Sequence, residues 1–221
     1  MERKNGFLIS SPEEVLIEWS KINLSNINKR PRAIPVRDFE TANNLKSWSD
    51  LSPYKHQVTD FIFSDQYFFS DRERVSINFI SLLDALIGNK SSHINLAIFT
   101  SNDAFDKNAV HLKNELESHL RQNGYNVNLF VLIDKAKQFK EHDRAIITNY
   151  FRITCGDSFD IFNTKNKLKT KGTTITFFPL VQTDFMTDTV AVLKNLYRIY
   201  EHPNNEYSNT LKNRLFHLIK A

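Results

Sequence analysis

Cysteine, glycine and proline are all scarce in this chain, and long apolar runs are missing. The single Cys in 221 residues excludes an internal disulfide framework and favours a reducing compartment. Five Gly and six Pro argue against a low-complexity chain. No apolar run approaches the ~20 residues that a membrane-spanning helix needs, and the first residues do not resemble a secretory signal. We therefore expect a cytoplasmic protein.

A strong charge of one sign is also missing. Lys and Arg total 29 and Asp and Glu total 25, which leaves a formal net charge of +4. That excess is too small to identify nucleic acid as the partner. The chain is long enough to bury a sizeable core, and 41% of its residues are hydrophobic, as is ordinary for a globular protein. The unusual feature is the number of phenylalanines, which is 18.

Alternating segment types from residue 56 onward predict an α/β fold. We expect strands at His56–Ser64, Ile94–Thr100 and Val127–Ile133, with amphipathic helices at Val75–Ile87 and Ala109–Gln122 between them. A β-α-β-α-β order favours parallel strands joined by right-handed crossovers with helices on the faces of the sheet.

The pattern changes in the last third of the chain. Arg144–Asn149 and Phe151–Cys155 are typical of two strands turned tightly, and Thr173–Phe178 of one more strand. Helices are expected at Phe185–Tyr200 and Leu211–Ile219. The whole pattern predicts a mixed sheet flanked by helices.

The first 55 residues have a different composition, rich in Asn, Lys and Ser, with one predicted helix that begins near Ser11 and ends near Ile22. We interpret residues 1–55 as an N-terminal extension, packed on the domain or serving as a partner-binding arm. Residues 56–221 are then the main domain.

The most informative segment carries polar residues at a regular spacing. It begins with His142 and Arg144, passes Asn149, and reaches Gly156 and Ser158. This spacing resembles the phospholipase D superfamily pattern of His, any residue, Lys, four residues, Asp, six residues, Gly and then a small polar residue. Arg144 stands where the family has Lys, and Asn149 where it has Asp.

The closer resemblance is to the phospholipase D-like C-terminal domain of MIT-domain proteins. There too the segment begins His-Asp-Arg, passes through a strand hairpin and reaches a Gly before an aromatic-Asp pair, here Phe159-Asp160. Asp65 and Tyr67, after the first predicted strand, are similar to the Asp-Pro-Tyr element of such domains, with Gln66 in place of the proline. The resemblance implies a single motif-bearing half of the phospholipase D-like fold, and binding to phosphoinositides or a membrane surface.

The resemblance also implies roles for the motif residues. In working members of the family the His attacks phosphorus, a second His protonates the leaving oxygen, the Lys holds the phosphoryl oxygens, and the acid orients the His. We therefore assign catalytic positions to His142, Arg144 and Asn149, with catalysis impaired because Asn149 cannot supply a negative charge. With one motif per chain, a complete site needs a homodimer.

Ligand-binding roles are expected for further residues. Ser158, Asp65 and Tyr67 should lie beside the motif in one pocket. Four alternating lysines should form a basic ridge if their segment is extended, although a solvated loop explains a charge run equally well. These are Lys165, Lys167, Lys169 and Lys171.

Other polar residues favour ordinary structural roles. Cys155 lies in an apolar strand and is expected in the core rather than as a nucleophile. Asp103, Asp106 and Asp134 follow strands and are expected to serve turns and helix caps. No Cys/His cluster has zinc spacing and no Gly-rich loop could cradle a nucleotide, so we expect neither a metal nor a cofactor.

Two functional hypotheses follow. The first is a catalytically impaired phospholipase D-like domain that binds an anionic, phosphate-bearing ligand: a lipid headgroup at a membrane surface, a nucleic-acid backbone or a phosphorylated protein. It would act in a homodimer or a larger protein complex. The alternative is a homodimeric phosphodiesterase or nuclease with His142 as nucleophile. A protein-interaction subunit with a vestigial pocket is the third option.

Overall fold

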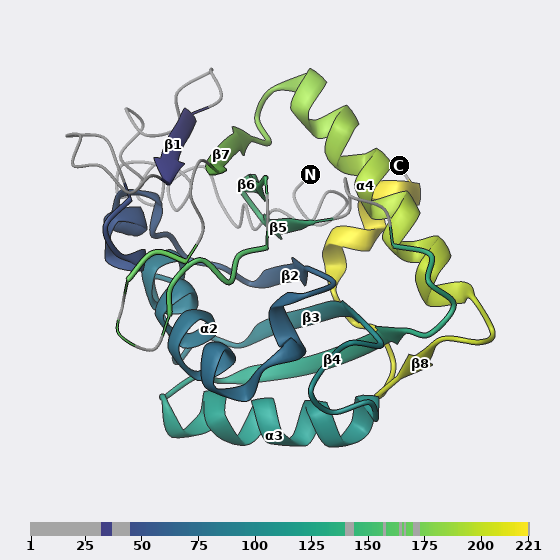
Figure 1. The fold of residues 1–221 in the computed structure, drawn as a ribbon. Coiled ribbons are helices and arrows are strands. Elements are labelled where there is room, and N and C mark those ends of the chain that lie inside the picture. Colours follow the sequence, from purple (N-terminus) through teal and green to yellow (C-terminus); the bar gives the residue numbers. More distant parts are fainter. Residues whose placement is uncertain are drawn as a thin grey trace.

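The computed structural model describes residues 32–36, 45–139, 144–156, 158–163, 165, 167–169 and 173–220. Among them, eight strands form one sheet in the order β1-β7-β6-β5-β2-β3-β4-β8 (Figure 1). The strands are β1 (Arg32–Val36), β2 (Asp60–Ser64), β3 (Ile94–Ser101), β4 (Val127–Asp134), β5 (Ala145–Thr148), β6 (Phe151–Cys155), β7 (Thr173–Pro179) and β8 (Glu206–Tyr207).

Parallel and antiparallel pairings divide this sheet. β2, β3 and β4 run parallel, and they are connected through α2 (Arg72–Leu86) and α3 (Ala109–Gln122). β5, β6, β7 and β1 add antiparallel strands on the β2 side, and β8 adds one beside β4. The α/β fold with a mixed sheet and helices packed on it is therefore confirmed.

The sheet has a hydrophobic core on each face. On one face, alternate residues of the central strands pack with α2 and α3; on the other they pack with α4 (Thr183–Glu201) and the 3₁₀ helix η5 (Arg214–Lys220). Figure 1 shows α2 and α3 on one side of the strands and α4 with the C-terminal segment on the other. Both faces are covered, which explains why β2 is buried at every position and apolar at its three central residues.

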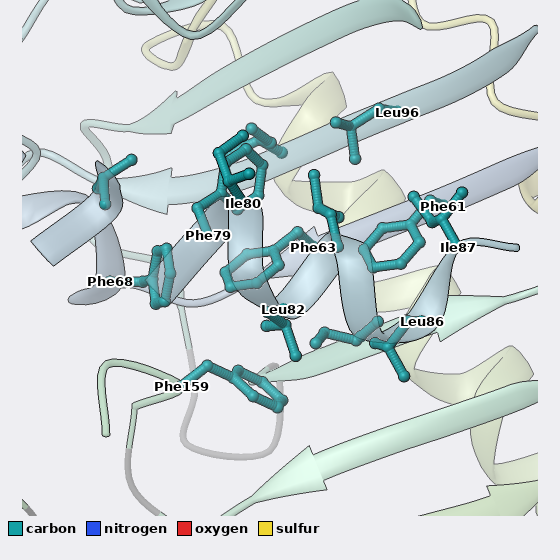
Figure 2. Close-up of a cluster of buried hydrophobic side chains, with 14 of the residues drawn as sticks. Phe61, Phe63, Phe68, Phe79, Ile80, Leu82, Leu86, Ile87, Leu96 and Phe159 are labelled. Carbon is teal, nitrogen blue, oxygen red and sulfur yellow. The ribbon is translucent and has the colours of Figure 1, made fainter. Parts of the chain in front are cut away.

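The many phenylalanines gather mainly on the α2 face. Phe63 of β2 is fully buried, and its ring centroid lies 4.7 Å from that of Phe68, 5.5 Å from Phe79 and 5.6 Å from Phe159 (Figure 2). Edge and tilted ring contacts of this kind add to the stabilisation that burial alone provides. The cluster joins β2, α2 and the segment after β6, and so supports the sheet edge where Asp65 lies.

The described part of residues 1–55 belongs to the sheet and the core. β1 pairs antiparallel with β7. The 3₁₀ helix η2 (Trp48–Tyr54) packs on α2 and buries Leu51 completely. These residues therefore pack on the main domain, one of the two arrangements expected for the extension. The predicted helix from Ser11 to Ile22 lies outside the described residues.

Several element ends differ from those predicted. α2 begins at Arg72 because the side chain of Asp71 accepts a hydrogen bond from the backbone of Glu73 and caps the first turn. The last helix is a 3₁₀ helix that begins three residues after Leu211. None of the helices in the described ranges is long and apolar enough to cross a bilayer.

His56 precedes β2 and gives the fold a measurable pH dependence. Its Nδ1 lies 2.5 Å from the carbonyl oxygen of Tyr54 and its Nε2 3.1 Å from the hydroxyl of Thr148. Burial lowers the pKa of His56 from 6.5 to about 4. Between these two pKa values His56 is protonated in the unfolded chain and neutral in the folded chain. Its contribution to the free energy of unfolding is therefore complete above the unfolded pKa and is lost as the pH falls toward the folded pKa.

We expect the free energy of unfolding to fall by about 2 kcal/mol between about pH 7 and about pH 5 because of His56. Urea denaturation of wild type and His56→Gln at both pH values measures this: the variant should lose less stability on acidification. His93→Gln, at an exposed site, is the matched control and should behave like wild type. Equal acid sensitivity in wild type and His56→Gln would contradict the assignment.

Candidate anion-binding site

Residues of the predicted motif meet at the carboxyl ends of the parallel strands. Asp65 directly follows β2, and Arg144 directly precedes β5. The antiparallel register pairs Ser64 with Ala145, which brings Asp65 and Arg144 to the same edge of the sheet. Ligand sites of open α/β sheets occur at this edge.

Asp65 is fully hydrogen-bonded within the protein. Its Oδ1 accepts from the backbone N–H of Tyr67 at 2.9 Å, and its Oδ2 accepts from the Ser158 hydroxyl and the Phe159 N–H, both at 2.8 Å. Burial raises the pKa of Asp65, although these bonds and the nearby Arg144 charge act to lower it. Asp65 thus joins the turn after β2 to the segment after β6, and it positions the site rather than offering a free oxygen.

Tyr67 lies beside Arg144, whereas Ser158 is linked to this edge of the sheet through Asp65. The Arg144 Cζ is 5.5 Å from the centroid of the Tyr67 ring, and Tyr67 is 44% exposed. The Ser158 hydroxyl donates to Asp65 and accepts from the backbone of Asp160. Tyr67 therefore remains accessible to a ligand beside Arg144, whereas Ser158 is engaged with its protein partners.

Arg144 and Arg152 share one cavity of about 540 Å³ between the β5–β6 hairpin, β7 and α4. Such a volume falls within the usual range for small-molecule sites. The cavity is lined by Arg144, Arg152, Thr154, Cys155, Gly156, Phe178, Asp188, Ala191 and Val192.

Arg152 is a largely buried cation in the wall of this cavity. Its side chain is only 12% exposed, and its Cζ lies 4.5 Å from the centroid of the Phe178 ring. The Asp188 carboxylate is 3.6 Å from a terminal nitrogen of Arg152, which makes an ion pair but is too long for a hydrogen bond. Burial lowers the pKa of Arg152, and Asp188 opposes that effect.

The two guanidinium groups have unused donors. Within the part of the chain that the structure describes, the Nε atoms of Arg144 and Arg152 are buried and have no hydrogen-bond partner. A terminal nitrogen of Arg144 donates a long bond of 3.5 Å to the carbonyl of Gly156. Buried polar groups are normally hydrogen-bonded, so two unpartnered donors are unusual. Because both Nε atoms have almost no accessible surface, an acceptor in the cavity would meet the terminal nitrogens of each guanidinium instead.

Sequence reasoning missed Arg152. A usable signal was present, because β6 reads Phe151-Arg-Ile-Thr-Cys, an apolar strand with a charge at an alternate position. Phe151 and Ile153 face the α2 side, so Arg152 and Thr154 face α4. What the pattern did not reveal is that α4 leaves a cavity over this part of the sheet.

Asn149 does not join this cavity, contrary to the prediction. It follows β5 at the end opposite Arg144, and at about 3.3 Å per residue the two Cα atoms are roughly 16 Å apart. Its Oδ1 accepts hydrogen bonds from the backbone N–H of Thr59 at 3.0 Å and of Asp60 at 3.1 Å. Asn149 therefore fixes the start of β2, and it does not orient a residue at the Arg144 edge.

Two predicted site residues, His142 and Lys171, lie outside the described residues. Of the other ridge lysines, Lys165 and Lys167 are exposed. Lys169 instead forms a partly buried ion pair with Asp160. The four lysines therefore do not form one free ridge, because Lys169 is bound to the protein.

The structural roles expected for other residues are present. Cys155 is buried and belongs to the α2-side core. Asp106 accepts from the Asn108 N–H in a turn, and Asp134 accepts from the N–H groups of Gln138 and Phe139. Asp103 contacts the Ser101 hydroxyl at 3.4 Å. Among the described residues, no group of three or more His, Cys, Asp or Glu side chains could hold a metal ion.

Comparisons with known proteins do not assign this chain to a family. No family model matches the chain, and no curated protein matches it either. We therefore argue the function from the cavity itself.

Proposed function

We propose that this chain binds a phosphate-bearing anion in the Arg144–Arg152 cavity. The observation that carries the proposal is the presence of two guanidinium groups in the lining of one cavity of about 540 Å³. A phosphate group offers several strong acceptor oxygens at the geometry that a guanidinium fork prefers. The terminal N–H groups of Arg144 and Arg152 would therefore donate to the same anion.

The charges around the cavity support an anion rather than a neutral ligand. Arg144 and Arg152 contribute two positive charges and Asp188 one negative charge. Asp188 is 65% exposed, so solvent screens its charge more than that of Arg152, whose side chain is 12% exposed. The interior of the cavity is consequently electropositive.

On this proposal the chain is a catalytically impaired phospholipase D-like domain that serves as a binding subunit of a larger complex. Asn149 supports the impairment in a way that the sequence did not suggest, because its side chain is committed to Thr59 and Asp60. Arg144 supports binding because a guanidinium stays charged and holds an anion in two-point fashion. The shared chemistry of candidate ligands is the phosphate group.

Titration calorimetry with inorganic phosphate tests the proposal. Arg144→Ala or Arg152→Ala should each weaken binding by about 1.5–3 kcal/mol, roughly 10- to 150-fold, the value of a hydrogen bond to a charged group. Asp188→Asn should strengthen binding because it removes the negative charge at the cavity. Arg121→Ala is the matched control, since Arg121 is 69% exposed and pairs with Glu117 on α3.

Two results would contradict binding in this cavity. One is no phosphate binding by wild type at low salt; the other is an equal loss in Arg121→Ala and Arg152→Ala, which would indicate a general field effect. A phosphodiester reporter distinguishes the enzyme alternative. Turnover by wild type that disappears in His142→Ala would establish the phosphodiesterase and replace the binding role.

A further inference from the structure

A second cavity lies between η2, α2 and the short ladder that pairs Phe162 with Leu168. Its volume is about 420 Å³, and it shares no lining residue with the arginine cavity. The lining consists of Lys46, Ser47, Trp48, Ser49, Ser52, Lys55, Ser81, Asp84, Ala85 and Phe162. The site already described therefore does not account for this cavity.

One part of the lining is apolar. Trp48, Ala85 and Phe162 are all buried, and the rings of Trp48 and Phe162 meet edge to face with centroids 5.4 Å apart. The indole N–H of Trp48 already donates to Asn78 at 2.9 Å, so this ring offers the cavity only hydrocarbon. Such a surface favours an apolar or aromatic group of a ligand.

The rest of the lining is polar and positively charged. Lys46 and Lys55 form no ion pair with any residue that the structure describes, and four serine hydroxyls lie around them. The one acid of the lining, Asp84, forms an ion pair with Lys90 at 2.6 Å and accepts a hydrogen bond from the hydroxyl of Tyr125. Asp50, outside the lining, accepts hydrogen bonds from the backbone N–H groups of Lys46 and Ser47. Two free ammonium groups beside hydroxyl donors favour an anionic group.

We propose that this cavity binds an organic anion with an apolar body, such as an aryl or branched aliphatic carboxylate or sulfonate. The apolar body lies against Trp48 and Phe162, and the acid group is held by Lys46 and Lys55. A ligand with only an apolar body or only an acid group would contact only the apolar or only the basic part of the lining, and should bind more weakly. Binding here is independent of phosphate binding at Arg144 and Arg152.

The fluorescent probe 8-anilinonaphthalene-1-sulfonate, which combines an aromatic body with a sulfonate, tests this inference. A Trp19→Phe background leaves Trp48 as the only tryptophan, because the chain has two. The probe should bind this protein at one site, with quenching of Trp48 and energy transfer to the probe. The double change Lys46→Ala with Lys55→Ala should weaken binding roughly tenfold, since exposed ion pairs are each worth up to about 1 kcal/mol.

A matched double change, Lys107→Ala with Lys194→Ala, removes the same charge from exposed positions outside the cavity and should leave binding within about twofold. Ser81→Phe should block binding while keeping both lysines and adding no tryptophan, because Ser81 is an exposed residue on the cavity wall. The uncharged analogue N-phenyl-1-naphthylamine should bind more weakly than the sulfonate.

Three outcomes would overturn the inference: no saturable transfer from Trp48, equal losses in the two lysine pairs, or full binding by Ser81→Phe. Losses confined to Arg144→Ala or Arg152→Ala would place the probe in the other cavity and overturn it as well.

Discussion

Replacing Arg214 with alanine should lower the free energy of unfolding by about 3–5 kcal/mol, because it leaves a buried carboxylate without its cation. The Asp60 side chain is completely buried at the start of β2. Two nitrogens of the Arg214 guanidinium donate to Asp60 Oδ2, at 2.9 and 2.6 Å, and the Arg214 backbone N–H donates to Oδ1 at 2.8 Å. The pair ties η5 to the central strand across 154 residues of sequence.

Urea denaturation of Arg214→Ala measures this effect. Arg198→Ala is the control, because Arg198 is exposed on α4 and bonds Asn195 one turn away; it should cost less than about 1 kcal/mol. Adding Asp60→Asn to Arg214→Ala should recover part of the loss, since it removes the uncompensated charge. If Arg214→Ala and Arg198→Ala destabilise equally, the ion pair does not stabilise the fold as argued.

Phe63→Ala should cost about 3–5 kcal/mol, the usual range for emptying a well-packed phenylalanine site. Phe63 is fully buried and contacts four phenylalanines on three different segments (Figure 2). Because Phe159 adjoins Ser158, and Ser158 bonds Asp65, the same change should also loosen the edge of the sheet where Arg144 lies.

Thermal unfolding compared with Phe185→Ala tests this prediction. Phe185 is only partly buried and has one aromatic contact, with Phe178 at 5.3 Å between centroids, so its loss should cost about 1 kcal/mol. Phe63→Leu should fall between the two, since it keeps most of the volume. Equal destabilisation by Phe63→Ala and Phe185→Ala would show that the cluster has no special role.

Hydrophobic periodicity predicted four of the elements within a residue, whereas β2 begins four residues later than predicted and α2 three residues earlier. The interval Ala109–Gln122 matches α3, Phe151–Cys155 matches β6, and β3 and β4 end one residue beyond their predicted limits. These segments bury apolar side chains at intervals set by local backbone geometry, so the spacing of apolar residues in the sequence identifies them. The Asp65, Tyr67 and Arg144 positions were also predictable, because they lie next to strand ends.

Alternation and spacing could not separate roles that depend on distant partners. In the alternating pattern of its strand, Arg152 occupies the same kind of position as any residue that points away from the α2 side. Only the placement of α4 makes it part of the lining of a cavity. Lys169 belongs to a regular run of lysines, yet Asp160 removes it from the ridge. Asn149 matches a motif position, yet strand length carries it away from Arg144.

Composition and periodicity thus determined the α/β class, the two apolar faces of the sheet and the edge at which polar residues gather, because these depend on local backbone repeats and on burial. Tertiary structure alone decided which cations share a cavity and which are neutralised. How far a charge is available to a ligand depends on how closely its oppositely charged neighbours bind it, and the neighbours of Arg144, Arg152 and Lys169 come from segments far apart in the chain.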